Sequence, residues 1–139
     1  MARKLLAAVV VAVAAGGVAQ ASGAQSPILL SAFAVNRHVV VKVSFGDLRP
    51  VELSVAKQRA VTTDGAFVQQ NVRLQETIRL PQATTGVARW QSNGTLAPGT
   101  YFVQVMAVET GGVTDCPKFF RTCLEHWSNV RRVVVPHAS

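Results

Sequence analysis

The chain has 139 residues, of which 49% are hydrophobic and 15% carry a charge, so it can build the core of one domain and is not a disordered polyelectrolyte. Its two cysteines are too few for a miniprotein held together by disulfides. The 14 Lys and Arg residues exceed the 7 Asp and Glu residues, which gives a formal net charge of +7.

The beginning of the chain has the layout of a secretory signal peptide. Two basic residues precede an apolar run over 5–15, and a stretch of small residues follows. This run is shorter than the roughly 20 residues that a membrane-spanning helix needs, and no later stretch is apolar for long enough. We therefore predict a signal-peptide helix within residues 1–24, cleaved after Ala21 or Ala24, and a secreted or cell-envelope protein without a membrane span. A retained N-terminal anchor is the alternative.

Removal of the signal peptide lowers the net charge, because it takes away two basic residues and no acidic one. The mature chain then has 12 basic and 7 acidic residues, a net charge of +5. Arg131 and Arg132 are the only adjacent basic pair, so we expect no nucleic-acid partner. The remaining positive charge either steers the protein toward anionic polymers or lipid headgroups, or only keeps the strand faces soluble.

Alternating apolar and polar residues recur along the rest of the chain, separated by Gly, Pro, Asn and Asp. The clearest case is 38–45, where Val39, Val41 and Val43 point to one side. No segment after the signal peptide has a helical stripe. The sequence predicts strands at 28–35, 38–45, 51–56, 71–80, 87–91, 101–108 and 129–135. Seven short strands joined by turns predict one all-β domain over 27–136, an antiparallel sandwich of two sheets.

Two places in the predicted strands indicate irregular structure, Glu76 and the pair Asn93-Gly94. Glu76 is the one polar residue on the apolar face of 71–80, so we expect a bend or bulge there. Asn93 and Gly94 form a preferred hairpin turn, which would end the strand that starts at Val87. The same residues begin an acceptor sequence for N-glycosylation, which is the less favoured interpretation.

The segment 96–105, Leu-Ala-Pro-Gly-Thr-Tyr-Phe-Val-Gln-Val, resembles the turn and penultimate strand of a fibronectin type III domain. In that family a Leu-x-Pro-Gly-Thr turn leads into a strand whose Tyr caps the corner. The number and order of the predicted strands agree with the family over most of the mature chain. The resemblance implies a seven-stranded immunoglobulin-like sandwich, and it implies no single function because such modules have many roles.

Two departures from the family pattern bear on this resemblance. The family usually has one more residue between the Thr and the Tyr, which places Phe102 at the usual Tyr position and leaves the corner hydrogen bond of Tyr101 open. The Trp of the family's second strand is absent, and Phe45 is the nearest substitute.

Cys116 and Cys123 lie in the segment before the last strand, and in an exported chain they predict a disulfide. The disulfide would stiffen a loop that displays two Phe residues and one Arg, and such side chains are good interface anchors. In the alternative interpretation, the Phe side chains fold back over the open end of the core. The predicted binding residues of this loop, 115–127, are Phe119, Phe120, Arg121 and Trp127.

The sequence gives less support to other chemistry. A metal site made by the two cysteines with His126 and Asp115 does not have the ligand spacing of common zinc sites, so we expect no metal and no cofactor. Nucleophile elbows, His-Glu-x-x-His pairs and phosphate-binding loops are absent from the sequence, so we expect no enzyme. Trp90 is either an exposed platform for a sugar ring or a core residue, and we expect the core.

These observations predict a non-catalytic secreted module that binds an extracellular protein or a cell-envelope polymer through the loop at 115–127. One alternative is an exported binder of a small ligand, either a cell-wall glycan or a metal ion. Another is a purely structural protein of the envelope.

Overall fold

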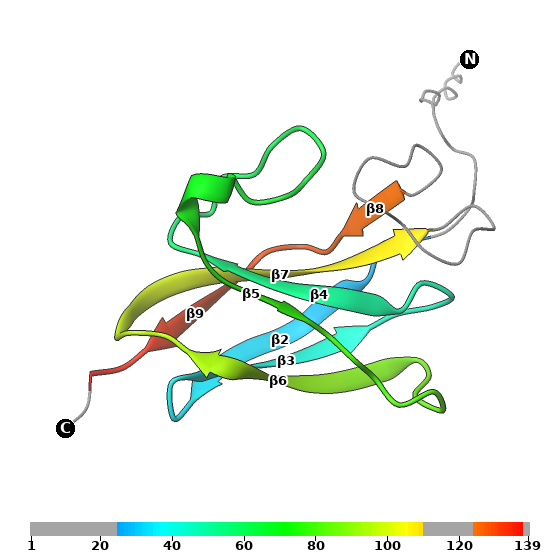
Figure 1. Cartoon of the computed structure of the whole chain (residues 1–139), viewed down its shortest axis with the longest axis horizontal. Coiled ribbons are helices and arrows are strands. Elements are labelled where there is room, and N and C mark those ends of the chain that lie inside the picture. Colours follow the sequence, from blue (N-terminus) through cyan, green and yellow to red (C-terminus); the bar gives the residue numbers. More distant parts are fainter. Residues whose placement is uncertain (1–24, 110–123, 138–139) are drawn as a thin grey trace, which may run out of the picture.

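The computed structural model describes residues 25–109 and 124–137. This part of the chain is all-β, as predicted, and a short 3-10 helix, η3 (Gln69–Asn71), precedes β5 (Figure 1). The strands are β2 (Ile28–Val35), β3 (His38–Ser44), β4 (Pro50–Ala56), β5 (Val72–Thr77), β6 (Val87–Thr95), β7 (Gly99–Glu109), β8 (Leu124–Trp127) and β9 (Arg131–Val135).

The strands form two antiparallel sheets, whose arrangement can be followed in Figure 1. In the first sheet β3 lies between β2 and β6. In the second sheet the order is β5-β4-β7-β8, and β9 also pairs with β7. Because β8 pairs with 106–109 and β9 with 99–103, these two strands follow one another along the same edge of β7.

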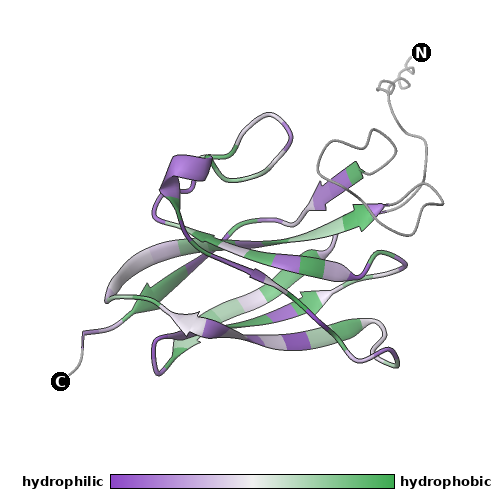
Figure 2. Cartoon of the chain, in the orientation of Figure 1, coloured by the Kyte–Doolittle hydropathy of each residue, from purple (hydrophilic) through white to green (hydrophobic). Residues whose placement is uncertain are grey.

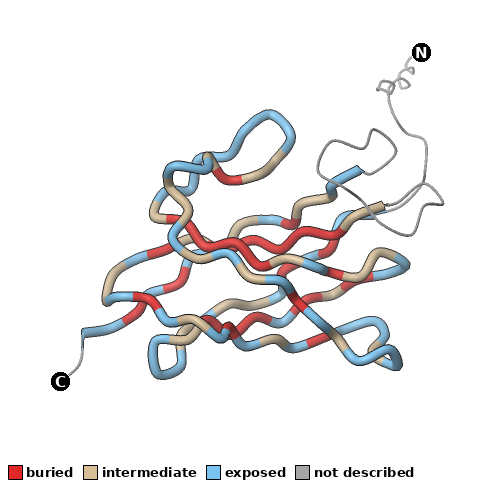
Figure 3. The backbone as a smooth tube through the Cα atoms, viewed as in Figure 1, coloured by how far each residue is buried: buried red, intermediate tan, exposed pale blue. Residues whose placement is uncertain are grey.

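The core lies between the two sheets, where alternate residues of the strands point inward. Val39, Val41 and Val43 of β3 face apolar residues of the second sheet such as Leu53 of β4 and Val103 of β7, and all five are at most 1% exposed. Figure 3 shows a continuous buried stretch, in red, along β4 and β7, and Figure 2 shows hydrophobic segments, in green, in both strands. Burial of this apolar surface is the main force that holds the sheets together.

Each predicted strand has a counterpart, but the predicted turn at Asn93 and Gly94 is wrong because both residues lie inside β6. The predicted bend at Glu76 is also wrong, since β5 keeps its pairing with β4 up to Thr77. One cause explains both results. The Glu76 carboxylate accepts hydrogen bonds from the backbone N–H groups of Asn93 (2.8 Å) and Gly94 (2.6 Å) on the other sheet, so this inward-pointing polar residue is paired.

The turn before β7 shows whether Tyr101 makes the corner hydrogen bond, a point that the family pattern left open. The Tyr101 hydroxyl donates a hydrogen bond to the Ala97 carbonyl over 2.7 Å, and the ring is only 4% exposed. The Lys57 ammonium lies 4.6 Å from the centre of the same ring. Tyr101 therefore ties the turn to the start of β7 despite its position directly after Thr100.

The segment expected to be a loop at 115–127 is a strand in its last four residues. β8 (Leu124–Trp127) pairs with the end of β7, and the last strand begins at Arg131 instead of Asn129. The predicted signal peptide and the predicted disulfide between Cys116 and Cys123 lie outside the described residues. Across 25–109 and 124–137, no helix has both the length and the apolar character needed to cross a membrane.

Candidate functional site

The connection between β4 and β5, residues 57–71, folds over the outer face of β7. There it is hydrogen-bonded to Gln104, and the Arg59 guanidinium lies 5.0 Å from the centre of the Phe102 ring. Gln104 is fully buried, and its amide donates to the Gly65 carbonyl (2.9 Å) and accepts from the Phe67 N–H (2.8 Å). A bridge between Val61 and Phe67 closes the connection on itself. Because an amide offers both a donor and an acceptor, Gln104 pairs with the connection as a neighbouring backbone segment would.

A hollow of about 300 Å³ opens beside this connection, on the outer side of the second sheet. We call it the Trp127 hollow. Residues from β4, β5, β8 and the 57–71 connection line it, so positions far apart in the sequence meet here. The lining residues are Glu52, Ser54, Ala66, Phe67, Gln69, Val72, Gln75, Glu125 and Trp127.

Trp127 is half-buried and forms one wall of the hollow. Its place opposite Met106 in the pairing of β7 with β8 puts it on the outer face of the sheet. Its indole N–H donates to a Glu125 carboxylate oxygen over 3.3 Å. The backbone of Gly65 has a φ of +97°, a conformation that favours glycine, and it lies beside Trp127: an added Cβ would be in ordinary van der Waals contact, 3.4 Å from the Trp127 Cβ.

The polar groups of the hollow are mostly acceptors. The Gln75 amide donates to a Glu52 carboxylate oxygen over 3.2 Å, which orients one carboxylate from the β4 side. Glu125 supplies the second carboxylate from β8. Two carboxylates, two amide side chains, a hydroxyl and two aromatic rings suit a ligand that carries hydroxyl or amide donors and an apolar face.

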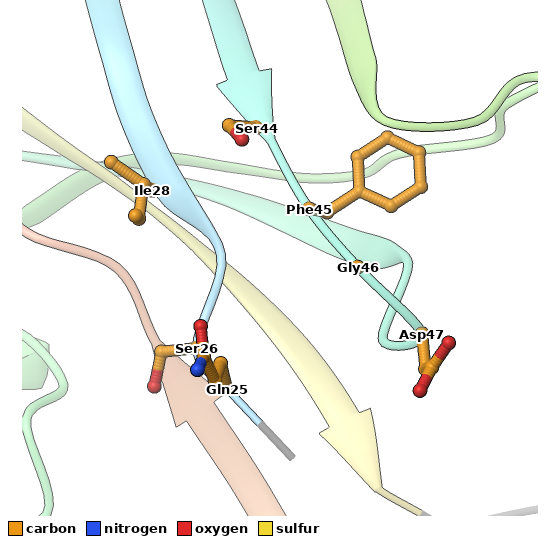
Figure 4. A pocket seen from close by; sticks show the side chains of 7 residues that line it. All are labelled: Gln25, Ser26, Ile28, Ser44, Phe45, Gly46 and Asp47. Carbon is orange, nitrogen blue, oxygen red and sulfur yellow. The ribbon is translucent and has the colours of Figure 1, made fainter.

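A second hollow of about 340 Å³ lies where β2 begins, lined by Gln25, Ser26, Ile28, Ser44, Phe45, Gly46 and Asp47. Figure 4 shows that the side chains of Phe45 and Asp47 point away from Gln25 and Ser26. Because these two side chains point away from the other side of the hollow, it is a weaker candidate than the Trp127 hollow.

Of the residues predicted from the sequence to bind a partner, the structure places only Trp127. Phe119, Phe120 and Arg121 lie outside the described residues, as do the two cysteines. The predicted loop and the hollow are nevertheless adjacent in the chain, since 110–123 leads directly into β8. Glu52, Gln69 and Gln75 were not among the predicted site residues, because no local sequence pattern marks residues of other segments as neighbours of Trp127.

His126, the histidine of the alternative metal site, lies on the opposite face of β8 from Trp127. Its Nε2 is 3.0 Å from a carboxylate oxygen of Glu109. Within the described residues, no three His, Cys, Asp or Glu side chains gather as metal ligands would.

Trp90 belongs to the core, as expected. It points inward from β6, is half-buried and packs against the core cluster. Its indole nitrogen is buried without a hydrogen-bond partner among the described groups. A ring that packs inward is not an open platform for a sugar.

Comparisons with protein-family models, with curated proteins and with solved structures give no match to this chain.

Proposed function

We propose that the chain is a non-catalytic secreted module, a fibronectin type III-like sandwich that binds an extracellular protein or a cell-envelope polymer. Two features support this type of sandwich. One sheet has the strand order β2-β3-β6, and the facing sheet has the order β5-β4-β7-β9. This is the strand order of fibronectin type III domains, and β8 extends the last strand along β7. The bond from Tyr101 to Ala97 corresponds to the tyrosine corner of such sandwiches.

The main support for a binding role is the Trp127 hollow. Aromatic residues in partly enclosed positions supply much of the energy of protein interfaces, and Trp127 occupies such a position beside two carboxylates. The predicted anchors Phe119, Phe120 and Arg121 belong to the segment that precedes β8, and they stay part of this proposal as predicted binding residues.

A cell-wall glycan is the second candidate ligand. The carboxylate of Glu52 could accept hydrogen bonds from sugar hydroxyls, and the amides of Gln69 and Gln75 could both donate and accept them. The indole of Trp127 would pack against the sugar ring. The hollow, rather than Trp90, would be the place of contact.

The test compares retention of two variants on insoluble peptidoglycan, chitin and cellulose, and on proteins of the culture medium. Trp127→Ala should weaken binding at least about tenfold, the effect of losing an aromatic anchor. Leu124→Ala is the matched control, because Leu124 is 50% exposed on the same strand but on its other face. We expect it to bind as the unmodified chain does.

The outcomes separate the candidates. Loss of retention on a glycan in Trp127→Ala alone supports the glycan, and loss of a protein partner supports the protein-binding role. The double variant Phe119→Ala with Phe120→Ala tests the predicted loop in the same assays. Equal binding by Trp127→Ala and the unmodified chain would refute the role of the hollow.

A further inference from the structure

The outer face of the first sheet carries exposed apolar side chains in a regular pattern. Alternate residues of β2 and β6 point away from the core here, as the pairing with β3 requires. Ile28, Phe33 and Val35 of β2 are 53%, 40% and 40% exposed, and Val87 of β6 is 47% exposed. We call this surface the β2-β3-β6 outer face. A contiguous group of exposed apolar residues on one face often marks a binding surface.

Two cations lie in the middle of this face. Lys42 of β3 pairs directly with Arg89 of β6, and both are exposed. Like charges directly opposite each other destabilise a sheet. None of the residues that point outward from these three strands is acidic, and neither cation forms an ion pair within the described part of the chain. The Arg89 guanidinium instead lies 5.6 Å from the centre of the Phe33 ring.

This pattern restricts what can cover the face. A second copy of the same face would bring four cations together, so self-association through it is disfavoured. An anion is required to offset the charge of Lys42 and Arg89. A soluble polyanion would neutralise the two cations but would leave Ile28, Phe33 and Val87 in water.

An anionic bilayer satisfies both demands. Its phosphate groups attract basic side chains, each by about 1 kcal/mol near the surface, and its headgroup boundary accepts apolar side chains. We propose that the β2-β3-β6 outer face is a docking surface for bilayers of anionic phospholipid. It lies on the other sheet from the Trp127 hollow, so this inference does not depend on the proposed ligand of that hollow.

The experiment measures co-sedimentation of the full chain, as recovered from an exporting host, with vesicles of phosphatidylcholine alone or mixed equally with phosphatidylglycerol. Binding should require phosphatidylglycerol. The double variant Lys42→Glu with Arg89→Glu should lower the partition coefficient at least about thirtyfold, since it removes two attractive charges and adds two repulsive ones. The control, Arg73→Glu with Arg132→Glu, makes the same change of net charge on the other sheet, where both residues are exposed. We expect it to change binding less than threefold.

A second pair of variants tests the apolar half of the surface. Phe33→Ser with Val87→Ser should reduce binding about tenfold or more, whereas Leu124→Ser with Val134→Ser removes residues of similar exposure from the second sheet and should have little effect. Equal binding to both kinds of vesicle, or equal loss in the two charge-reversal variants, would overturn the proposal. Loss in the Lys42 variant without loss in the Phe33 variant would also overturn it, in favour of a soluble polyanion.

Discussion

The side-chain amide of Asn129 pairs with both backbone groups of Leu29. Its Oδ1 accepts the Leu29 N–H over 2.8 Å, and its Nδ2 donates to the Leu29 carbonyl over 3.1 Å. The Arg131 guanidinium donates to the same carbonyl over 2.9 Å. Leu29 lies at a bulge of β2 and is fully buried, and Asn129 comes just before β9. The amide thus links β2 of the first sheet to the segment just before β9 of the second sheet.

We predict that Asn129→Ala lowers the free energy of unfolding by about 1–3 kcal/mol, because it leaves the buried N–H of Leu29 without an acceptor. Arg131 still pairs with the carbonyl, which limits the loss. Unfolding in urea, followed by circular dichroism, measures the effect. Asn93→Ala is the control, since its side chain is exposed and the change should cost less than about 0.5 kcal/mol. Equal stabilities of the two variants would show that the pairing contributes nothing.

The hydroxyl of Tyr101 gives a second prediction about the corner. Tyr101→Phe keeps the buried ring and removes only the bond to the Ala97 carbonyl, so we expect a loss of about 0.5–2 kcal/mol in unfolding free energy. Lys57→Met removes the cation beside the same ring and should cost about 0.5–1 kcal/mol. Thermal unfolding of both variants makes the comparison. A Tyr101→Phe variant as stable as the unmodified chain would contradict a structural role for this corner bond.

The strands could be predicted from the sequence because their signal is local. Alternation over 38–45 depends only on neighbouring residues, and the structure has β3 at nearly the same bounds. Asn93 and Gly94 show where this approach fails. Gly94 does not have a positive φ, and a Cβ there would lie 2.8 Å from a methyl carbon of Leu74, so the glycine allows close packing between sheets instead of a turn. That reason depends on a residue twenty positions earlier in the chain.

The candidate site shows the same limit. Trp127 was predicted as a binding residue from its type and its place after the cysteines. The described strand β8 has only four residues, so no local pattern separated it from a loop. Glu52 and Gln75 join Trp127 only because three other strands and the 57–71 connection bring them together. The residue types at positions 52 and 75 do not by themselves predict that arrangement.

Gln104 gives a third prediction, which concerns the 57–71 connection. Gln104→Met fills a similar volume but leaves the Gly65 carbonyl and the Phe67 N–H without partners, so we expect a loss of about 2–4 kcal/mol. The amide of Phe67 should also exchange its hydrogen faster, because its N–H has lost the hydrogen bond to the Gln104 side chain.

Hydrogen exchange followed by mass spectrometry measures this change segment by segment. Gln91→Met is the matched control, since Gln91 is exposed on β6 and the same substitution there should leave exchange at 57–71 unaltered. If Gln104→Met exchanged at the same rate as the control, the amide would not be what holds the connection in place.

The tip of the 57–71 connection provides a prediction about pH. The Thr62 hydroxyl donates a hydrogen bond to the Asp64 carboxylate, and this bond lowers the pKa of Asp64 below its ordinary value of 3.8. Because the pKa is lower in the folded chain than in the unfolded one, the charged form of Asp64 stabilises the tip above pH 3.8. That stabilisation is lost as the pH falls through the pKa of the folded state. Asp64 is exposed, so the contribution is small.

Thr62→Val should therefore raise the pKa of Asp64 toward 3.8, since it removes the largest cause of the shift. An NMR titration of the Asp64 carboxyl carbon between pH 2 and pH 6 measures the change directly. Thr77→Val replaces an exposed threonine at the end of β5, away from the tip, and should leave the titration of Asp64 as it is in the unmodified chain. An unchanged pKa of Asp64 in Thr62→Val would mean that the hydroxyl does not hold the carboxylate in solution.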